Sequence, residues 1–167
     1  MKKRNIILIG MPGAGKSSVG VILAKVLGYE FIDTDLVIQH REKRLLREII
    51  ADEGNEGFLA IENEVNATLE ADESVIAPGG SAIYGKEAME HFKEIGIIVY
   101  LKLSYEDLAK RLGNLKGRGV VLKEGQTLKD LYDERSKLYE QYAEITVDES
   151  GKDIQGTILA LREQIGM

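Results

Sequence analysis

The residues with the clearest chemistry lie in a glycine-rich stretch near the N-terminus. It runs Gly10-Met11-Pro12-Gly13-Ala14-Gly15-Lys16-Ser17 and follows an apolar run at 5–9. Its glycines let backbone N–H groups turn toward an anion, and a helix that begins there would add the positive end of its dipole. Lys16 can reach the terminal phosphates of a nucleotide, and the Ser17 hydroxyl can bind the accompanying Mg²⁺. Because the spacing matches the Walker A pattern at every fixed position, it favours a phosphate-binding loop over an incidental glycine-rich turn.

Two acids follow the second predicted strand, which covers 30–32. Asp33 and Asp35 would lie at the carboxyl ends of the strands, where ligands bind in open parallel sheets. Phosphoryl transfer needs carboxylates for the metal shell and for the attacking hydroxyl, and two acids one residue apart could serve both tasks. In the alternative interpretation, Asp33 ends the strand and Asp35 caps the next helix. The residues alone leave both interpretations open.

A pair of glycines follows the third predicted strand at 74–77. Gly79 and Gly80 lie in the sequence Pro78-Gly79-Gly80-Ser81, at the same edge of the sheet. Paired glycines allow the backbone to approach a ligand closely, and they are equally common in simple turns.

Three arginines accompany a glycine-rich segment with little periodic structure. The segment covers about 112–126, and Arg111, Arg118 and Arg135 lie before, within and after it. Guanidinium groups suit anion recognition because their planar fork offers paired donors and stays charged. We predict that the segment is a mobile lid; the alternative is a solvated connecting loop with surface arginines.

The elements that must position these residues alternate between short apolar runs and helical stretches, which predicts an α/β fold with a parallel sheet. Predicted strands cover 5–9, 30–32, 74–77, 96–101 and 145–147. Predicted helices cover 16–27, most of 35–52, 58–70 after an interruption by Gly54 and Gly57, two segments opened by capping boxes at 104–107 and 127–130, and 153–165. A cluster of acids is expected to form a solvated helix face rather than a metal site, namely Asp52, Glu53, Glu56, Glu62 and Glu64.

The composition limits the classes of function. A chain of 167 residues is the size of one domain, and it contains no cysteine for disulfides, thiol nucleophiles or zinc–thiolate sites. Its net charge of −6 argues against nucleic acid as a partner, while small anions remain compatible with a locally cationic site. The apolar run near the N-terminus is too short for a membrane or signal segment. We therefore expect a cytoplasmic monomer that acts on a small molecule, without nucleic-acid or membrane partners.

Taken together, these residues resemble the shikimate kinases, a branch of the small P-loop kinases related to nucleoside monophosphate kinases. The match includes the Gly10–Ser17 loop, Phe31-Ile32-Asp33-Thr34-Asp35, the Gly54…Phe58…Glu62 stretch, Gly79-Gly80, Arg111, Arg118, and Arg135 followed by Tyr139. The resemblance implies a single three-layer αβα domain over 1–167 with a five-stranded parallel sheet. It also implies a helical substrate-binding subdomain at about 34–62 and a lid at about 112–126. The expected reaction is the transfer of the γ-phosphoryl group of MgATP to the 3-hydroxyl of a small hydroxylated substrate, shikimate.

The resemblance also implies roles for individual residues. The expected nucleotide contacts are Gly13, Ala14, Gly15, Lys16, Ser17, Ser18, Arg111 beside the adenine, and Arg118 closing onto the γ-phosphate. Ser17 and Asp33 would hold Mg²⁺. The expected substrate contacts are Asp35, Gly79, Gly80 and Arg135, the last on the substrate carboxylate. Lys16, Asp35 and Arg118 would be catalytic, with Asp35 as the base.

The chain departs from the family pattern mainly on the acceptor side. The family's Gly-Glu-x-x-Phe-Arg-x-x-Glu stretch has Asn55 for its first glutamate and Leu59 for its arginine, which grips the shikimate carboxylate. Ser81 replaces the third glycine of the family's triplet, and Gly119-Val120 replaces Pro-Leu in the lid. Another cation, with Arg41, Arg44 and Arg47 the nearest in sequence, would then supply the contact, or the acceptor would lack that carboxylate.

Two other functions remain as alternatives. One is a relative that binds nucleotide without turnover. The other is a GTPase-type switch, but the Asn-Lys-x-Asp motif that such proteins use to read guanine is not in the sequence.

Overall fold

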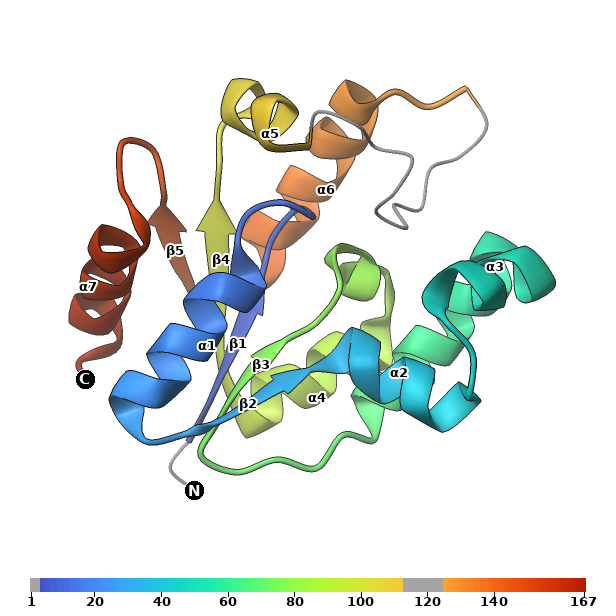
Figure 1. The fold of residues 1–167 in the computed structure, drawn as a ribbon, viewed down its shortest axis with the longest axis horizontal. Helices are drawn as coiled ribbons and strands as arrows, with labels where there is room; N and C mark the ends of the chain where they lie inside the picture. Colours follow the sequence, from blue (N-terminus) through green and yellow to red (C-terminus); the bar gives the residue numbers. More distant parts are fainter. Residues whose placement is uncertain (1–3, 113–124) are drawn as a thin grey trace.

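The computed structural model describes residues 4–112 and 125–167, in which five parallel strands form a sheet of order β2-β3-β1-β4-β5 (Figure 1). The strands are β1 Asn5–Ile9, β2 Glu30–Asp33, β3 Ser74–Ala77, β4 Gly96–Lys102 and β5 Ile145–Asp148. The central strand, β1, pairs with β3 on one side and with β4 on the other. This confirms the predicted five-stranded parallel sheet, and it places the carboxyl end of β1 in the middle of the edge where ligands bind.

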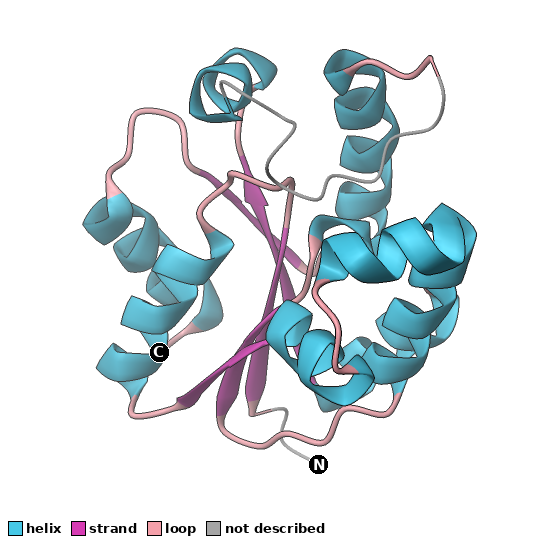
Figure 2. Cartoon of the chain, turned by 45° about the vertical axis from the view of Figure 1, so that its right-hand side comes forward, coloured by secondary structure: helices cyan, strands magenta, loops and turns pink. Residues whose placement is uncertain are grey.

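Helices cover both faces of the sheet (Figure 2). They are α1 Lys16–Leu27, α2 Thr34–Glu42, α3 Leu46–Ala67, α4 Lys86–Ile95, α5 Tyr105–Leu112, α6 Leu128–Tyr142 and α7 Ile154–Ile165, with a 3₁₀ helix, η1, at Gly80–Tyr84. Alternate residues of β1 pack into two separate hydrophobic cores, because successive side chains of a strand point to opposite faces of the sheet. Ile6 and Leu8 pack with α1 and α7, whereas Ile7 and Ile9 pack with α4, α5 and α6.

Helices α2 and α3 extend beyond the edge of the sheet, with a small core of their own. Ile38 of α2 packs there against three side chains of α3, namely Ile49, Phe58 and Val65. The region coincides with the substrate-binding subdomain predicted at about 34–62. Its boundaries stay a prediction.

The helix boundaries between residues 35 and 67 differ in part from those predicted from the sequence. The predicted helix over 35–52 is two helices, which separate at Lys43 because this residue adopts a left-handed conformation with φ 55°. The predicted interruption is confirmed at Gly54, whose φ of 74° and ψ of 176° are not helical, so that α3 consists of two helical segments joined by a kink; Gly57 lies within the second segment, which continues to Ala67. Ile49 before the kink and Phe58 and Val65 after it pack in the same small core, so both segments of α3 face the same side.

Other local predictions are confirmed. Gly28 ends α1 in the left-handed conformation with φ 74°. Thr127 opens α6 with a reciprocal capping box, in which its Oγ1 accepts from the N–H of Asp130 at 3.1 Å. Most of the predicted lid, together with Arg118, falls in 113–124 and lies outside the described residues. Within the described ranges, no helix is both long and apolar enough to cross a bilayer.

Candidate active site

The glycine-rich loop connects β1 to α1, and its shape depends on glycine. Gly10, Gly13 and Gly15 have φ angles of 155°, 90° and 83°, a region that other residues rarely adopt. A methyl group at Gly10 would also lie 2.8 Å from the carbonyl oxygen of Leu101, and one at Gly13 would lie 2.9 Å from Cδ2 of Leu112. The loop therefore lies tightly against β4 and α5, as a rigid anion-binding turn requires.

The N-terminus of α1 opens into this loop. Its N-cap is Gly15, which has no side chain to cap the first-turn N–H groups, and no acid lies in that first turn. These N–H groups and the helix dipole therefore favour an external anion. Ser17 and Ser18 are exposed at the same place and line a cavity in front of the loop.

Lys16 is held inside the loop. Its Nζ donates to the carbonyl oxygens of Gly10 at 2.7 Å and Met11 at 2.9 Å, and the residue is only 9% exposed. Burial lowers the pKa of Lys16 to about 8, against the opposing effect of the Asp35 carboxylate. An arriving polyphosphate would supply the negative charge that this buried ammonium group lacks.

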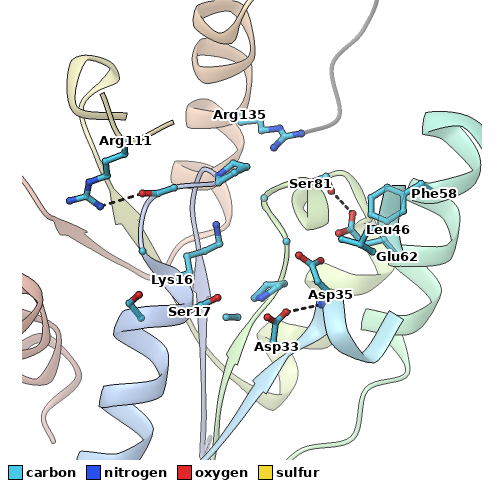
Figure 3. Close-up of a pocket in the computed structure, with 18 residues that line it drawn as sticks. Lys16, Ser17, Asp33, Asp35, Leu46, Phe58, Glu62, Ser81, Arg111 and Arg135 are labelled. Atoms are coloured by element: carbon cyan, nitrogen blue, oxygen red, sulfur yellow. Dashed lines mark hydrogen bonds between the residues drawn. The ribbon is translucent and has the colours of Figure 1, made fainter. Parts of the chain in front are cut away.

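The cavity has a volume of about 450 Å³ and joins the phosphate-binding loop to residues from the other half of the fold (Figure 3). Its lining combines the loop and α1 with the ends of β2 and β3, one side of α3, η1, and single arginines from α5 and α6. These residues are Pro12, Gly13, Gly15, Lys16, Ser17, Ser18, Asp33, Asp35, Leu46, Phe58, Glu62, Ala77, Pro78, Gly79, Gly80, Ser81, Arg111 and Arg135. Of the predicted site residues, Ala14 is fully buried inside the loop and Arg118 is not described.

The two acids after β2 have different tasks. Asp33 caps α2, because its Oδ1 accepts from the N–H of Asp35 at 2.9 Å. The Asp35 side chain points into the cavity (Figure 3). Burial raises the pKa of Asp35 to about 6, Asp33 raises it further, and Lys16 lowers it. The alternative that Asp33 ends the strand is therefore correct, and one of the two acids does cap the next helix. The capping residue, however, is Asp33 and not Asp35.

Positions 79 and 80 require glycine, because the side chains around them leave no room for a Cβ atom. A methyl group at Gly79 would lie 2.9 Å from Oδ1 of Asp35 and 3.0 Å from Oε2 of Glu62. A methyl group at Gly80 would lie 2.9 Å from Nη1 of Arg135. The φ angle of Gly79 is an ordinary −62°, so the close approach, and not the turn, explains the glycine here.

Two of the predicted arginines line the cavity from different helices. Arg135 is 1% exposed on α6, and its guanidinium carbon lies 5.5 Å from the centre of the Tyr84 ring. The same helix is tied to η1 by Tyr139, whose hydroxyl donates to the carbonyl oxygen of Gly80 at 2.7 Å. Arg111 is exposed, and its Nη1 donates to the carbonyl oxygen of Gly13 at 3.3 Å, on the loop side.

The arginines near α2 do not line the cavity. Arg44 forms ion pairs with Glu42, Asp52 and Glu53, while Arg41 pairs with Glu64 at 2.9 Å. Leu59 is also absent from the lining and packs instead on the core of the α2–α3 region.

Sequence reasoning was wrong about Glu62. It was predicted on a solvated face, yet it is 1% exposed and lines the cavity one helical turn after Phe58. Ser81 Oγ donates to its Oε1 at 2.7 Å. The spacing of four from Phe58 was the available signal, because residues four apart share a helix face. The other four acids of the predicted cluster are exposed, as predicted: Asp52, Glu53, Glu56 and Glu64.

Sequence reasoning also missed Glu149, which follows β5. It is 5% exposed, and burial raises its pKa to about 7 while Arg111 and Lys16 lower it. Glu149 therefore belongs to the electrostatic surroundings of the phosphate-binding loop.

The donor atoms at the loop suit a magnesium ion that arrives with a nucleotide. The Ser17 hydroxyl and the Asp33 carboxylate line the same cavity, and oxygen ligands are those that Mg²⁺ prefers. The described ranges contain no group of three or more histidines, cysteines or acids that could hold a metal alone. An ion at this position would take its other ligands from phosphate oxygens and water, as Mg²⁺ commonly does.

Comparison with known proteins places this cavity in context. A family model described as shikimate kinase matches residues 12–165. A shikimate kinase of Vibrio cholerae is 37% identical over 169 residues, which cover 98% of this chain and 97% of that protein. A solved shikimate kinase from Acinetobacter baumannii, in complex with shikimate, is 33% identical with a TM-score of 0.86, covering 97% of this chain and 92% of its own. The shikimate kinase of Aquifex aeolicus is 28% identical with a TM-score of 0.78, over 97% and 96% of the two chains.

Proposed function

Because this chain belongs to the shikimate kinase family, we propose that it phosphorylates the 3-hydroxyl of shikimate with ATP as the donor. One observation carries the proposal: a single cavity connects a phosphate-binding loop to a partly buried carboxylate, Asp35, and a buried arginine, Arg135. A donor phosphate and a hydroxylated acid can therefore meet in one place. Phosphoryl transfer depends mainly on such positioning and on charge stabilisation.

On the donor side, the loop and α1 would bind the phosphates of ATP. Main-chain N–H groups of Gly13 to Ser18 would face the phosphates, and Lys16 would neutralise charge that develops on the transferred group. Ser17 and Asp33 would hold Mg²⁺, which supplies charge neutralisation between the phosphates when bound. Arg111 would lie beside the adenine, and Arg118 would close onto the γ-phosphate from the segment outside the described residues.

On the acceptor side, Asp35 would accept a hydrogen bond from the 3-hydroxyl and take its proton as the acceptor oxygen bonds to the γ-phosphorus. The bond from that phosphorus to the β–γ bridging oxygen breaks, and ADP leaves. With its pKa raised to about 6, Asp35 is still mostly ionised near neutral pH and is a stronger base than an ordinary aspartate. Backbone groups of Gly79 and Gly80 would contact the ring, and Arg135 would bind the carboxylate.

The retained residues favour a working kinase over a nucleotide-binding relative without turnover. Lys16, Asp35 and Arg135 lie around one cavity together with Gly79 and Gly80. The expectations that the protein is a monomer, acts in the cytoplasm and has no nucleic-acid or membrane partner stay predictions.

A coupled assay of ADP release tests the proposal. Shikimate, a hydroxy acid without the ring and a polyol without a carboxylate would each be supplied with ATP and Mg²⁺. We expect turnover with shikimate and none above background with the polyol. Lys16→Ala should abolish turnover, whereas Lys25→Ala, on an exposed position of the same helix, should leave it unchanged. Turnover of another acceptor in preference to shikimate would contradict the proposal, and unchanged turnover by Lys16→Ala would contradict the site assignment.

A further inference from the structure

Tyr84 is a partly buried side chain at the last residue of η1, and none of the steps above uses it. The guanidinium carbon of Arg135 lies over its ring, 5.5 Å from the ring centre. Its hydroxyl donates to Oε2 of Glu134, the residue before Arg135 on α6. Burial and the bond to Glu134 raise the pKa of this hydroxyl against the opposing effect of Arg135, so it stays protonated at neutral pH. Tyr84 therefore contacts two consecutive residues of α6, one with its ring and the other with its hydroxyl.

Both ends of η1 contact Arg135. At the first residue, Gly80, a methyl group would lie 2.9 Å from Nη1 of Arg135, so the guanidinium group lies directly against the backbone there. At the last residue, the Tyr84 ring lies against the same guanidinium group. Tyr139 joins α6 to the first residue as well, through its bond to the Gly80 carbonyl oxygen at 2.7 Å. The position of Arg135 relative to the glycine backbone is thus set from η1 itself.

The orientation of Arg135 matters because the acceptor end of the cavity has few cations. Among the described residues that line the cavity, the other two cations, Lys16 and Arg111, lie beside the phosphate-binding loop. Position 59 holds a leucine that packs on an apolar core. An arginine binds a carboxylate best when it presents paired N–H groups, and a side chain that must first be ordered loses affinity. A contact that orders Arg135 in advance should therefore strengthen acceptor binding.

We propose that Tyr84 is a positioning residue for the acceptor: its ring fixes the orientation in which Arg135 meets the acceptor carboxylate, and its bond to Glu134 keeps the ring in place. The inference rests on the proposed function, because it takes a hydroxylated carboxylic acid as the acceptor. Tyr84 is not among the residues that line the cavity, so it acts through Arg135 and does not touch the acceptor. The attraction between a cation and the face of an aromatic ring strengthens when both are shielded from water, as at this partly buried ring and buried arginine.

Initial-rate kinetics of two Tyr84 variants test the inference. Tyr84→Leu removes the ring, so the KM for shikimate at saturating ATP should rise about threefold to thirtyfold, the range that one cation–ring contact accounts for. The KM for ATP should stay at its wild-type value, because Tyr84 lies in the acceptor half. Tyr84→Phe keeps the ring over Arg135 and loses only the hydroxyl. Its KM for shikimate should therefore be closer to that of the wild type than to that of Tyr84→Leu.

Tyr132→Leu is the matched control. Tyr132 is also a partly buried tyrosine, and it lies on α6 three residues before Arg135. Its ring packs against Tyr105, and its hydroxyl donates to the carbonyl oxygen of Leu103 at 2.7 Å. Removing it should lower the stability of the protein toward urea without changing the KM for shikimate. The control thus separates a loss of packing around α6 from a loss of orientation at Arg135.

Each outcome supports or overturns the inference. An unchanged KM for shikimate in Tyr84→Leu, or an equal rise in Tyr84→Phe and Tyr84→Leu, would overturn it and leave the proposed function intact. Equal rises in the KM for shikimate and for ATP, or the same rise in Tyr132→Leu, would indicate a general structural effect and would also overturn it. Absence of shikimate phosphorylation by the wild type would instead overturn the proposed function, and the inference with it.

Discussion

Replacing Glu62 by glutamine should stabilise the ligand-free protein, and the gain should grow with pH. The free carboxylic acid has an ordinary pKa of 4.5, and burial in the folded protein raises the pKa of Glu62 to about 7. Between these values the folded state binds more protons than the unfolded state, so the free energy of unfolding falls as pH rises. The loss begins near the unfolded pKa and is complete above the folded pKa.

The size of the effect follows from the difference between the two pKa values. At ~1.4 kcal/mol per pKa unit, ionised Glu62 should cost the folded state about 3 kcal/mol at pH 8 and less than about 1 kcal/mol at pH 5. Glutamine cannot ionise and can keep a hydrogen bond with Ser81. The difference in unfolding free energy between Glu62→Gln and wild type should therefore grow by about 2–3 kcal/mol from pH 5 to pH 8, a large share of a typical domain's stability.

Urea unfolding followed by circular dichroism, at several pH values and without ligands, measures this difference. Glu64→Gln is the matched control, because it removes an exposed carboxylate whose surface ion pair with Arg41 is worth about 0–1 kcal/mol. A constant offset between Glu62→Gln and wild type at all pH values would mean that Glu62 is not a buried titrating acid. That result would refute the reasoning even if the variant were more stable throughout.

Two further substitutions test the packing of the acceptor side. Gly80→Ala would place a methyl group 2.8 Å from Cδ of Pro12 and 2.9 Å from Nη1 of Arg135. Displacing these groups should cost about 1–3 kcal/mol and raise the KM for shikimate about tenfold or more, while the KM for ATP changes little. An unaltered KM for shikimate in initial-rate kinetics would contradict this prediction. Leu59→Arg removes a partly buried apolar side chain from the α2–α3 core, so thermal unfolding should occur at a lower temperature. If shikimate is the acceptor, the KM for shikimate should fall or stay the same in this variant. A marked rise in that KM would count against shikimate as the acceptor.

The donor half of the site could be predicted from sequence because its parts are contiguous. Gly10 to Ser17 carry the main-chain N–H groups, the lysine and the helix start within eight residues, and their positive φ angles demand glycine locally. A short motif with a buried strand before it and a helix after it therefore specifies its own geometry. The five strands were predicted for the same reason, since each is a short apolar run between turn signals.

The acceptor half could not be predicted in the same way, because its residues meet only in the folded chain. Asp35, Glu62 and Arg135 come from three helices, and nothing in their local sequence brings them together. Asp35 and Arg135 could be singled out by residue type and position, but their roles at the acceptor came from the family resemblance. Glu62 was misplaced, because the general exposure of carboxylates outweighed its position one turn after a buried phenylalanine.

The two halves of the site should also respond differently to substitution. The donor half is held largely by main-chain geometry at the glycines, so a change of another side chain leaves the main-chain N–H groups that face the phosphates in place. The acceptor half is held by side chains that press on the backbone of Gly79 and Gly80, and Tyr139 couples α6 to that backbone through the Gly80 carbonyl. A change at any of these contacts moves Arg135 relative to the ring it would bind. Acceptor selectivity is therefore the property that a few substitutions around η1 can change, while the ability to bind ATP persists.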